Sequence, residues 1–157
     1  MALSPLETFD DETIEEVEAQ PGPSRTYKLN SETNEIGGFI DGEAALRQFI
    51  EKAIRTARFR FLIYDDDYGC ELEELLGEDI TQELLEMEIP DIITDALIYD
   101  DRINDVTNFA IDRQGDAVYI SFDVDANLAD EQPVSSITRY TFGAFIHGII
   151  LLGEEAA

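Results

Sequence analysis

Carboxylates at Asp65, Asp67 and Glu71 have the alternating spacing of ligands in a calcium-binding loop. Such a loop needs a glycine at its sixth position and a bidentate glutamate at its twelfth. Counted from Asp65, those two positions hold Cys70 and Leu76. We therefore predict a solvated turn at this place rather than a metal site.

Cys70 and His147 are the single cysteine and the single histidine of the chain. Cys70 has no second cysteine for a disulfide, a zinc site or a redox pair. His147 lies in an apolar run without a carboxylate close in sequence, which predicts a histidine packed in the core. Paired carboxylates can hydrolyse a glycoside, but among 36 acidic residues any two will meet somewhere. The sequence therefore predicts no cofactor, no metal and no catalytic residue.

The charge of the chain limits its partners. Ten basic and 36 acidic residues give a formal charge of −26. We therefore do not expect nucleic-acid binding, because phosphate contacts need clustered Lys and Arg. Membrane insertion is not expected, because the longest apolar run, Phe142 to Leu152, is far shorter than the ~20 residues that a membrane helix needs. The charge either favours a basic partner surface or reflects plain solubility or an acidic host proteome.

The first 24 residues form an acidic arm. Seven acidic residues precede the first basic one, and the sequence Pro21 to Ser24 then breaks the chain. The arm is acidic and has no long apolar region, so we do not interpret it as a signal peptide. It is either a disordered leader or a segment that docks on a partner.

The segment from Arg25 to Leu76 combines hairpin, helix and strand signals. Turn residues separate two alternating runs, an N-cap aspartate precedes a helical apolar stripe, and a run of aromatic and branched residues follows. In order, we predict strands at 25–30 and 35–40, a helix from Asp41 to about Arg58, a buried strand at 59–64 and a short helix at 72–76.

Five of the ten basic residues lie between Arg47 and Arg60. They either form internal pairs, such as Glu51 with Arg55 at helical spacing, or present a contact face to an acidic neighbour.

The second half of the chain shows mainly strand signals. We predict a helix at 81–97 that is kinked or divided at Pro90, strands at 106–111 and 117–124, a polar linker at 127–136 and a tail at 137–152 with one or two strands. The apolar tail either completes its own sheet or pairs with the sheet edge of another chain.

These elements predict an α+β fold, with a small mixed sheet of hairpins packed against two to three helices, an acidic N-terminal arm and a C-terminal strand-like tail. We divide the chain into the arm at 1–24, an α+β domain at 25–126, and a linker with the strand-like tail at 127–157.

The order of these pieces resembles the baseplate wedge or sheath-initiator family of contractile phage tails and phage-tail-like particles. The resemblance covers roughly residues 26–126, and its markers are Thr56, the turn from Tyr68 to Leu72, and the segment from Asp100 to Ile103. Many family members carry Glu-Pro-Arg at the last marker. This chain keeps an acid at Asp100 and the arginine at Arg102, but has Asp101 in place of the proline.

The resemblance implies a structural, non-enzymatic baseplate component that is assembled in the host cytoplasm, in several copies around the tail axis. Its implied partners are the baseplate wedge proteins and the sheath subunits of the same particle. The family's Glu-Pro-Arg segment contacts the helical bundle of the wedge proteins, which implies that Asp100, Arg102 and Ile103 lie at that contact. Family members also start the sheath by offering strands to extended arms of sheath subunits. We expect the tail to supply this strand, with Ile137, Tyr140, Phe142 and Phe145 as partner-binding residues.

Two alternative functions come from the carboxylates. One is a carboxylate-based peptidoglycan hydrolase, similar to lysozyme, and wall cleavage that a single Asp or Glu substitution abolishes would favour it. The other is an acidic stand-alone binding module that mimics nucleic acid. The basic residues between Arg47 and Arg60 argue against this second alternative.

Overall fold

The computed structural model describes residues 24–76, 79–130, 132–145 and 148–156. The acidic arm up to residue 23 and His147 lie outside the described residues, and so do the predictions made for them. The helices are α1 (Gly42–Arg55), α2 (Leu72–Leu76) and α3 (Gln82–Leu97), and the strands are β1 (Thr26–Asn30), β2 (Glu35–Ile40), β3 (Ile103–Gln114), β4 (Ala117–Asp130), β5 (Gln132–Phe145) and β6 (Gly148–Ala156).

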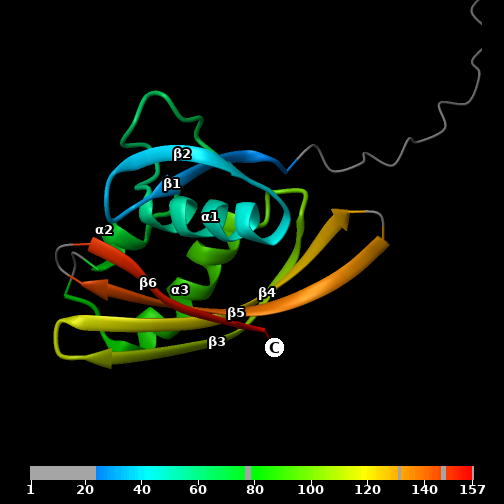
Figure 1. Ribbon diagram of the computed structural model, residues 1–157. Coiled ribbons are helices and arrows are strands. Elements are labelled where there is room, and N and C mark those ends of the chain that lie inside the picture. Colours follow the sequence, from blue (N-terminus) through cyan, green and yellow to red (C-terminus); the bar gives the residue numbers. More distant parts are fainter. Residues whose placement is uncertain (1–23, 77–78, 131, 146–147, 157) are drawn as a thin grey trace, which may run out of the picture.

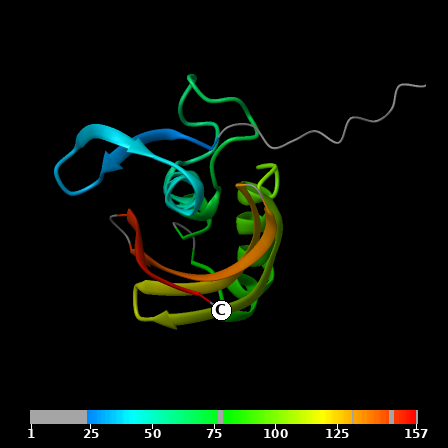
Figure 2. The same ribbon diagram turned by 45° about the vertical axis from the view of Figure 1, so that its right-hand side comes forward.

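The described strands form two antiparallel sheets. β1 and β2 form a hairpin, and the other four strands follow one another in the order β3-β4-β5-β6. Helix α1 lies between the hairpin and the four-stranded sheet (Figure 1). Figure 2 shows that this larger sheet is strongly curved. The α+β prediction is confirmed, although both sheets are antiparallel rather than mixed.

The core lies between the helices and one face of the four-stranded sheet. Alternate residues of β4, from Val118 to Val124, are buried, as their spacing predicts. Phe122 stacks with Phe142 at a centroid distance of 5.9 Å, and Tyr140 lies 6.2 Å from Phe122. The helices contribute the buried residues Leu46, Ile50, Ile54, Leu85, Ile89, Ile93 and Leu97.

Helix α1 begins where its sequence predicts. The Asp41 carboxylate accepts a hydrogen bond from the backbone N–H of Gly42 at 2.7 Å, and Glu51 pairs with Arg55 at 3.0 Å. The helix ends at Arg55 rather than near Arg58, because the backbone of Thr56 turns to an extended conformation.

Residues 59–64 do not form the predicted buried strand, and that prediction is wrong. They follow a series of turns in a loop closed at its base, where Cys70 N donates to Thr56 O at 2.9 Å and Arg58 N donates to Cys70 O at 3.2 Å. Phe59 has a positive φ of 63°, and Leu62 and Ile63 are almost fully exposed. The run has strand composition but pairs with no strand of either sheet, and its backbone forms turn hydrogen bonds instead.

The prediction of a polar linker at 127–136 is also wrong. β4 and β5 continue through most of this segment and stay paired as far as Asp130 with Gln132. The inner parts of both strands are already held in register by the core, so the ladder extends outward without needing a buried face.

The tail completes its own sheet as β5 and β6, as the first of its two predicted alternatives requires, and the pairing of its outer edge with another chain stays a prediction. Because Tyr140 and Phe142 are core residues, the tail is part of the folded domain and not an appendage. Helix α3 runs as one helix through Pro90, so it is not divided there.

The basic residues of α1 and the following loop form mostly internal contacts. Arg47 pairs with Glu154 at 3.2 Å and Arg60 pairs with Glu73 at 3.0 Å, while Arg58 donates to the Gly69 carbonyl at 3.1 Å. The internal alternative therefore accounts for most of this cluster. Lys52 is different: it lies over the rings of Tyr64 and Tyr68, at 5.4 and 5.6 Å.

Candidate partner-binding site

The turn after α3 holds a compact, half-buried ion pair. The Arg102 guanidinium donates to both carboxylate oxygens of Asp100, at 2.9 and 2.8 Å, and the Arg102 backbone N–H donates to the same carboxylate at 3.0 Å. The two side chains are 16% and 14% exposed. This bidentate arrangement fixes the turn more firmly than an ordinary surface pair does.

Neighbouring elements hold this turn from both sides. The Arg102 guanidinium lies 5.5 Å from the ring centroid of Phe49 on α1. The backbone carbonyl of Arg102 accepts a hydrogen bond from Asn127 N on β4 at 2.8 Å. Ile103 is buried, and Tyr99 makes an edge contact with Phe49 at 6.1 Å. The turn is therefore a rigid feature of the surface.

The pKa of Asp100 reflects two opposing effects. Burial raises the pKa of this carboxyl, but the hydrogen bonds and charge of Arg102 outweigh burial, so the pKa lies below its usual range. The hydrogen bond from Arg102 to Asp100 correspondingly raises the pKa of the guanidinium above its usual value. The pair is fully charged at neutral pH.

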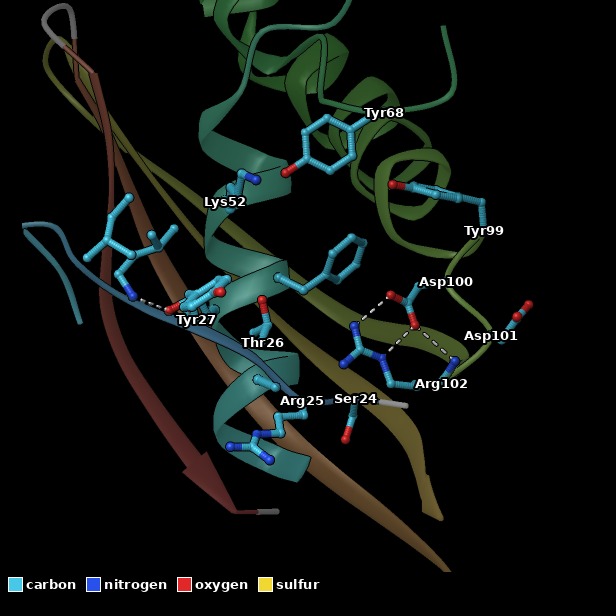
Figure 3. A pocket seen from close by; sticks show the side chains of 15 residues that line it. Ser24, Arg25, Thr26, Tyr27, Lys52, Tyr68, Tyr99, Asp100, Asp101 and Arg102 are labelled. Carbon is cyan, nitrogen blue, oxygen red and sulfur yellow. Dashed lines mark hydrogen bonds and ion pairs between the residues drawn. The ribbon is translucent and has the colours of Figure 1, made fainter. Parts of the chain in front are cut away.

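A hollow of about 660 Å³ opens beside the turn, between the hairpin and α1. Figure 3 shows the Asp100–Arg102 pair on one wall, with Ser24 and Arg25 toward one end and Lys52 and Tyr68 toward the other. Gln48 joins α1 to β1 across the hollow, because its side chain accepts from Leu29 N and donates to Tyr27 O, each at 2.8 Å. The walls of the hollow thus combine aromatic rings with charged groups, which suits a peptide better than a small apolar ligand.

The hairpin that walls this hollow exposes much apolar surface. Tyr27 is 60% exposed, Ile36 70% and Phe39 57%. A two-stranded hairpin has little stability on its own, and exposed aromatic and branched side chains are typical of interaction surfaces. The hairpin and the turn together therefore form a candidate partner-binding surface.

The turn from Tyr68 to Leu72 has a structural role at the base of the exposed loop. Gly69 has a φ of 108°, and a Cβ at this position would lie 2.9 Å from the Thr56 carbonyl oxygen. Cys70 is buried, and burial raises the pKa of its thiol to about 11. No group of three His, Cys, Asp or Glu residues that could hold a metal ion occurs among the described residues.

The predicted tail residues do not come together at one surface. Tyr140 and Phe142 face the core, and Phe145 is half-buried with an edge contact to Tyr119 at 6.1 Å. Ile137 is 46% exposed. Exposed apolar side chains occur instead on β6, where Ile150 is 45% and Leu152 is 51% exposed.

Sequence reasoning missed two residues that shape the site. Phe49 was part of an apolar helical stripe, and nothing in its spacing distinguished it from core residues. Tyr99 lies just beyond the helix predicted at 81–97, and its position directly before Asp100 is a signal that could have identified it.

The fold and the site together describe a small α+β domain with a rigid charged turn and open sheet edges, a form suited to holding neighbouring proteins. The family model for the contractile injection system sheath initiator matches residues 25–129, and this chain belongs to that family. The chain is 40% identical over 129 residues to the phage-like element PBSX protein XkdS of Bacillus subtilis (strain 168), covering 81% of this chain and 90% of that relative.

These matches confirm the resemblance seen in the sequence and support a structural role related to a phage tail or its sheath. Membership of the family implies interaction with other tail or sheath components of the same particle. No helix within the described part of the chain is long and apolar enough to cross a membrane.

Proposed function

We propose that this chain is a non-enzymatic baseplate component that joins wedge proteins through the turn around Asp100 and Arg102 and starts the sheath by strand addition at β6. We also propose that several copies of the chain surround the tail axis and that the particle is assembled in the host cytoplasm. The observation that carries it is the open edge of β6, because a strand at a sheet edge offers unpaired backbone groups to another chain.

The wedge contact is supported by the rigidity of the turn. Asp100 and Arg102 satisfy each other, and Ile103 anchors the turn in the core. The exposed parts of this surface are Asp101, Tyr99 and the apolar side of the hairpin. A pre-formed surface loses little conformational entropy when a helical bundle packs on it.

The two edges of the four-stranded sheet differ in how well they can accept a strand. β3 contains two register irregularities, has a positive φ of 54° at Asn108, and its Ile111 carbonyl already accepts from the Gln82 side chain at 3.3 Å. Bulges and covering groups protect an edge from pairing. β6 has one irregularity and its Glu154 pairs with Arg47 of α1 at 3.2 Å, but from Gly148 to Leu151 it pairs regularly with β5.

β6 also presents the side chains that a paired strand would cover. Ile150 and Leu152 are about half exposed, whereas Ile149 faces the core. Strand addition would therefore bury apolar surface as well as backbone groups. We therefore propose that β6 carries the strand-pairing role predicted for the tail, while Tyr140 and Phe142 hold the neighbouring strand β5 in the core.

The test introduces lysines on β6, because a lysine on an exposed edge opposes strand pairing. The double variant Ile150→Lys/Leu152→Lys is produced with all other particle proteins, and baseplates and sheaths are counted by electron microscopy. We expect normal baseplates with a large loss of sheath. Deletion of residues 137–157 is not a suitable test, because it removes Tyr140 and Phe142 from the core.

Two controls match this variant. Met87→Lys places a lysine at a 71% exposed position on α3 and is expected to leave the sheath intact. Ile36→Lys places one on β2 of the hairpin, which we assign to the wedge contact, so it should reduce the number of baseplates, whereas the β6 variant should reduce only the sheath. If baseplates of the β6 variant still carry sheath, the assignment to β6 is wrong.

A further inference from the structure

Lys52 is an unpaired cation in a very acidic chain. Among the described residues its ammonium forms no ion pair and lies over the rings of Tyr64 and Tyr68. Beside it the Tyr68 hydroxyl is buried and faces Thr56 without a hydrogen bond of normal geometry. Lys52 and Tyr68 lie at the same end of the hollow, as Figure 3 shows. An ammonium and a hydroxyl donor at one place favour a carboxylate ligand.

The chain carries a segment with matching chemistry. Residues 1–23 contain seven acidic residues and no Lys or Arg. Near the end of this arm, Ile14 and Val17 are interspersed with Glu15, Glu16 and Glu18. This pattern combines carboxylates for Lys52 with apolar side chains for the rings of the hollow.

The root of the arm lies at the opposite end of the same hollow. Ser24 lines it and is held at the start of α1, since Gly42 N donates to the Ser24 hydroxyl at 3.2 Å and that hydroxyl donates to Asp41. Lys52 lies ten residues further along α1, a rise of about 15 Å. Six residues of extended chain span about 20 Å. Glu18, six residues before Ser24, can therefore reach Lys52, and Glu15 and Glu16 reach it with chain to spare.

We propose that the acidic arm folds back along the hollow between α1 and β1, so that a carboxylate from Glu15 to Glu18 binds Lys52 of the same chain. The short tether makes this intramolecular contact more favourable than the same contact between separate molecules. The opposite charges make the contact weaken with added salt. A docked arm also covers the surface around Asp100 and Arg102, so that the arm and a wedge protein compete for it. This last consequence rests on the proposed function, whereas the docking does not.

The test is carbodiimide cross-linking of the purified full-length chain, which joins an amine to a carboxylate in contact with it. We expect the monomer fraction to contain an amide between Lys52 and Glu15, Glu16 or Glu18, identified by mass spectrometry. Lys28 is the internal control, because it is exposed, has no ion pair among the described residues and does not line this hollow, although Lys52 also lines the second hollow in which Lys28 lies. Lys52 without a link to the arm, or Lys28 linked to the arm as often, would overturn the proposal.

Mixing chains with natural and ¹⁵N-labelled nitrogen separates links within one molecule from links between copies, and links mainly between copies would overturn the intramolecular proposal.

Hydrogen exchange gives a second measurement. We expect amides of residues 14–18 to exchange about tenfold more slowly than in an unfolded chain, and this protection to disappear in Lys52→Gln but not in Lys28→Gln. Unprotected arm amides in the unaltered chain would contradict docking. Both measurements use the isolated protein, so their failure is distinct from a failure of wedge binding or sheath initiation.

Discussion

Replacement of Arg102 by methionine tests whether the ion pair fixes the turn after α3. Methionine keeps an apolar stem over Phe49 but removes the hydrogen bonds at 2.9 and 2.8 Å to Asp100. Removing one partner of a charged, half-buried pair leaves the other carboxylate partly desolvated, and we expect a loss of about 2 kcal/mol in the free energy of unfolding. For a chain of this length that loss corresponds to a fall in Tm of about 4–8 °C.

The pH dependence of this loss has a defined sign. The folded-state pKa of Asp100 is lowered, so the stabilisation by the pair is present above the unfolded-state pKa and is lost as the pH falls through the folded-state pKa. The difference between the unaltered chain and Arg102→Met should therefore be full at pH 7 and shrink below about pH 4. Thermal unfolding followed by circular dichroism at several pH values measures it.

A double-mutant cycle and a neighbouring control complete this experiment. Asp100→Asn combined with Arg102→Met should cost less than the sum of the single changes, with an interaction energy of about 1–2 kcal/mol. Asp101→Asn alters an exposed acid in the same turn and should change stability by no more than about 0.5 kcal/mol. Strictly additive single changes, or an equal effect of Asp101→Asn, would refute the reasoning.

Two further predictions concern the base of the exposed loop. Gly69→Ala should lower the free energy of unfolding by about 1–3 kcal/mol, because φ is positive and the new Cβ meets the Thr56 carbonyl. Gly37→Ala is the control in the same urea titration, because a Cβ at Gly37 has no atom within 4 Å, and equal losses in the two variants would contradict the strain argument. Cys70 should react with a maleimide at pH 8 only as fast as the protein opens, because its thiol is 1% exposed and has a pKa of about 11; rapid labelling without urea would disprove this.

Much of the fold could be predicted because local signals agreed with the tertiary structure. The alternation in β4 and the Asp41 cap of α1 each match their final surroundings. Residues 59–64 misled the prediction because Phe, Leu and Ile favour a strand wherever a partner strand exists, and here no strand pairs with them. The polar segment at 127–136 misled it for the opposite reason, since backbone pairing with a neighbour already in register does not need apolar side chains.

The candidate site was only partly predictable. Asp100 and Arg102 were identified through a family motif, but their mutual ion pair depends on a turn geometry that composition does not specify. Apolar residues of the tail were expected to contact partners, yet the position of β5 inside the sheet places Tyr140 and Phe142 in the core and leaves Ile150 and Leu152 of the edge strand exposed. Sheet order, which decides between these outcomes, arises from long-range pairing.

A high-resolution cryo-electron microscopy map of the junction between baseplate and sheath tests the central claim most directly. The account predicts a strand of a sheath subunit hydrogen-bonded along the open edge of β6, with Ile150 and Leu152 covered. A map in which that edge faces solvent while the first sheath subunits attach to another part of this chain would contradict it.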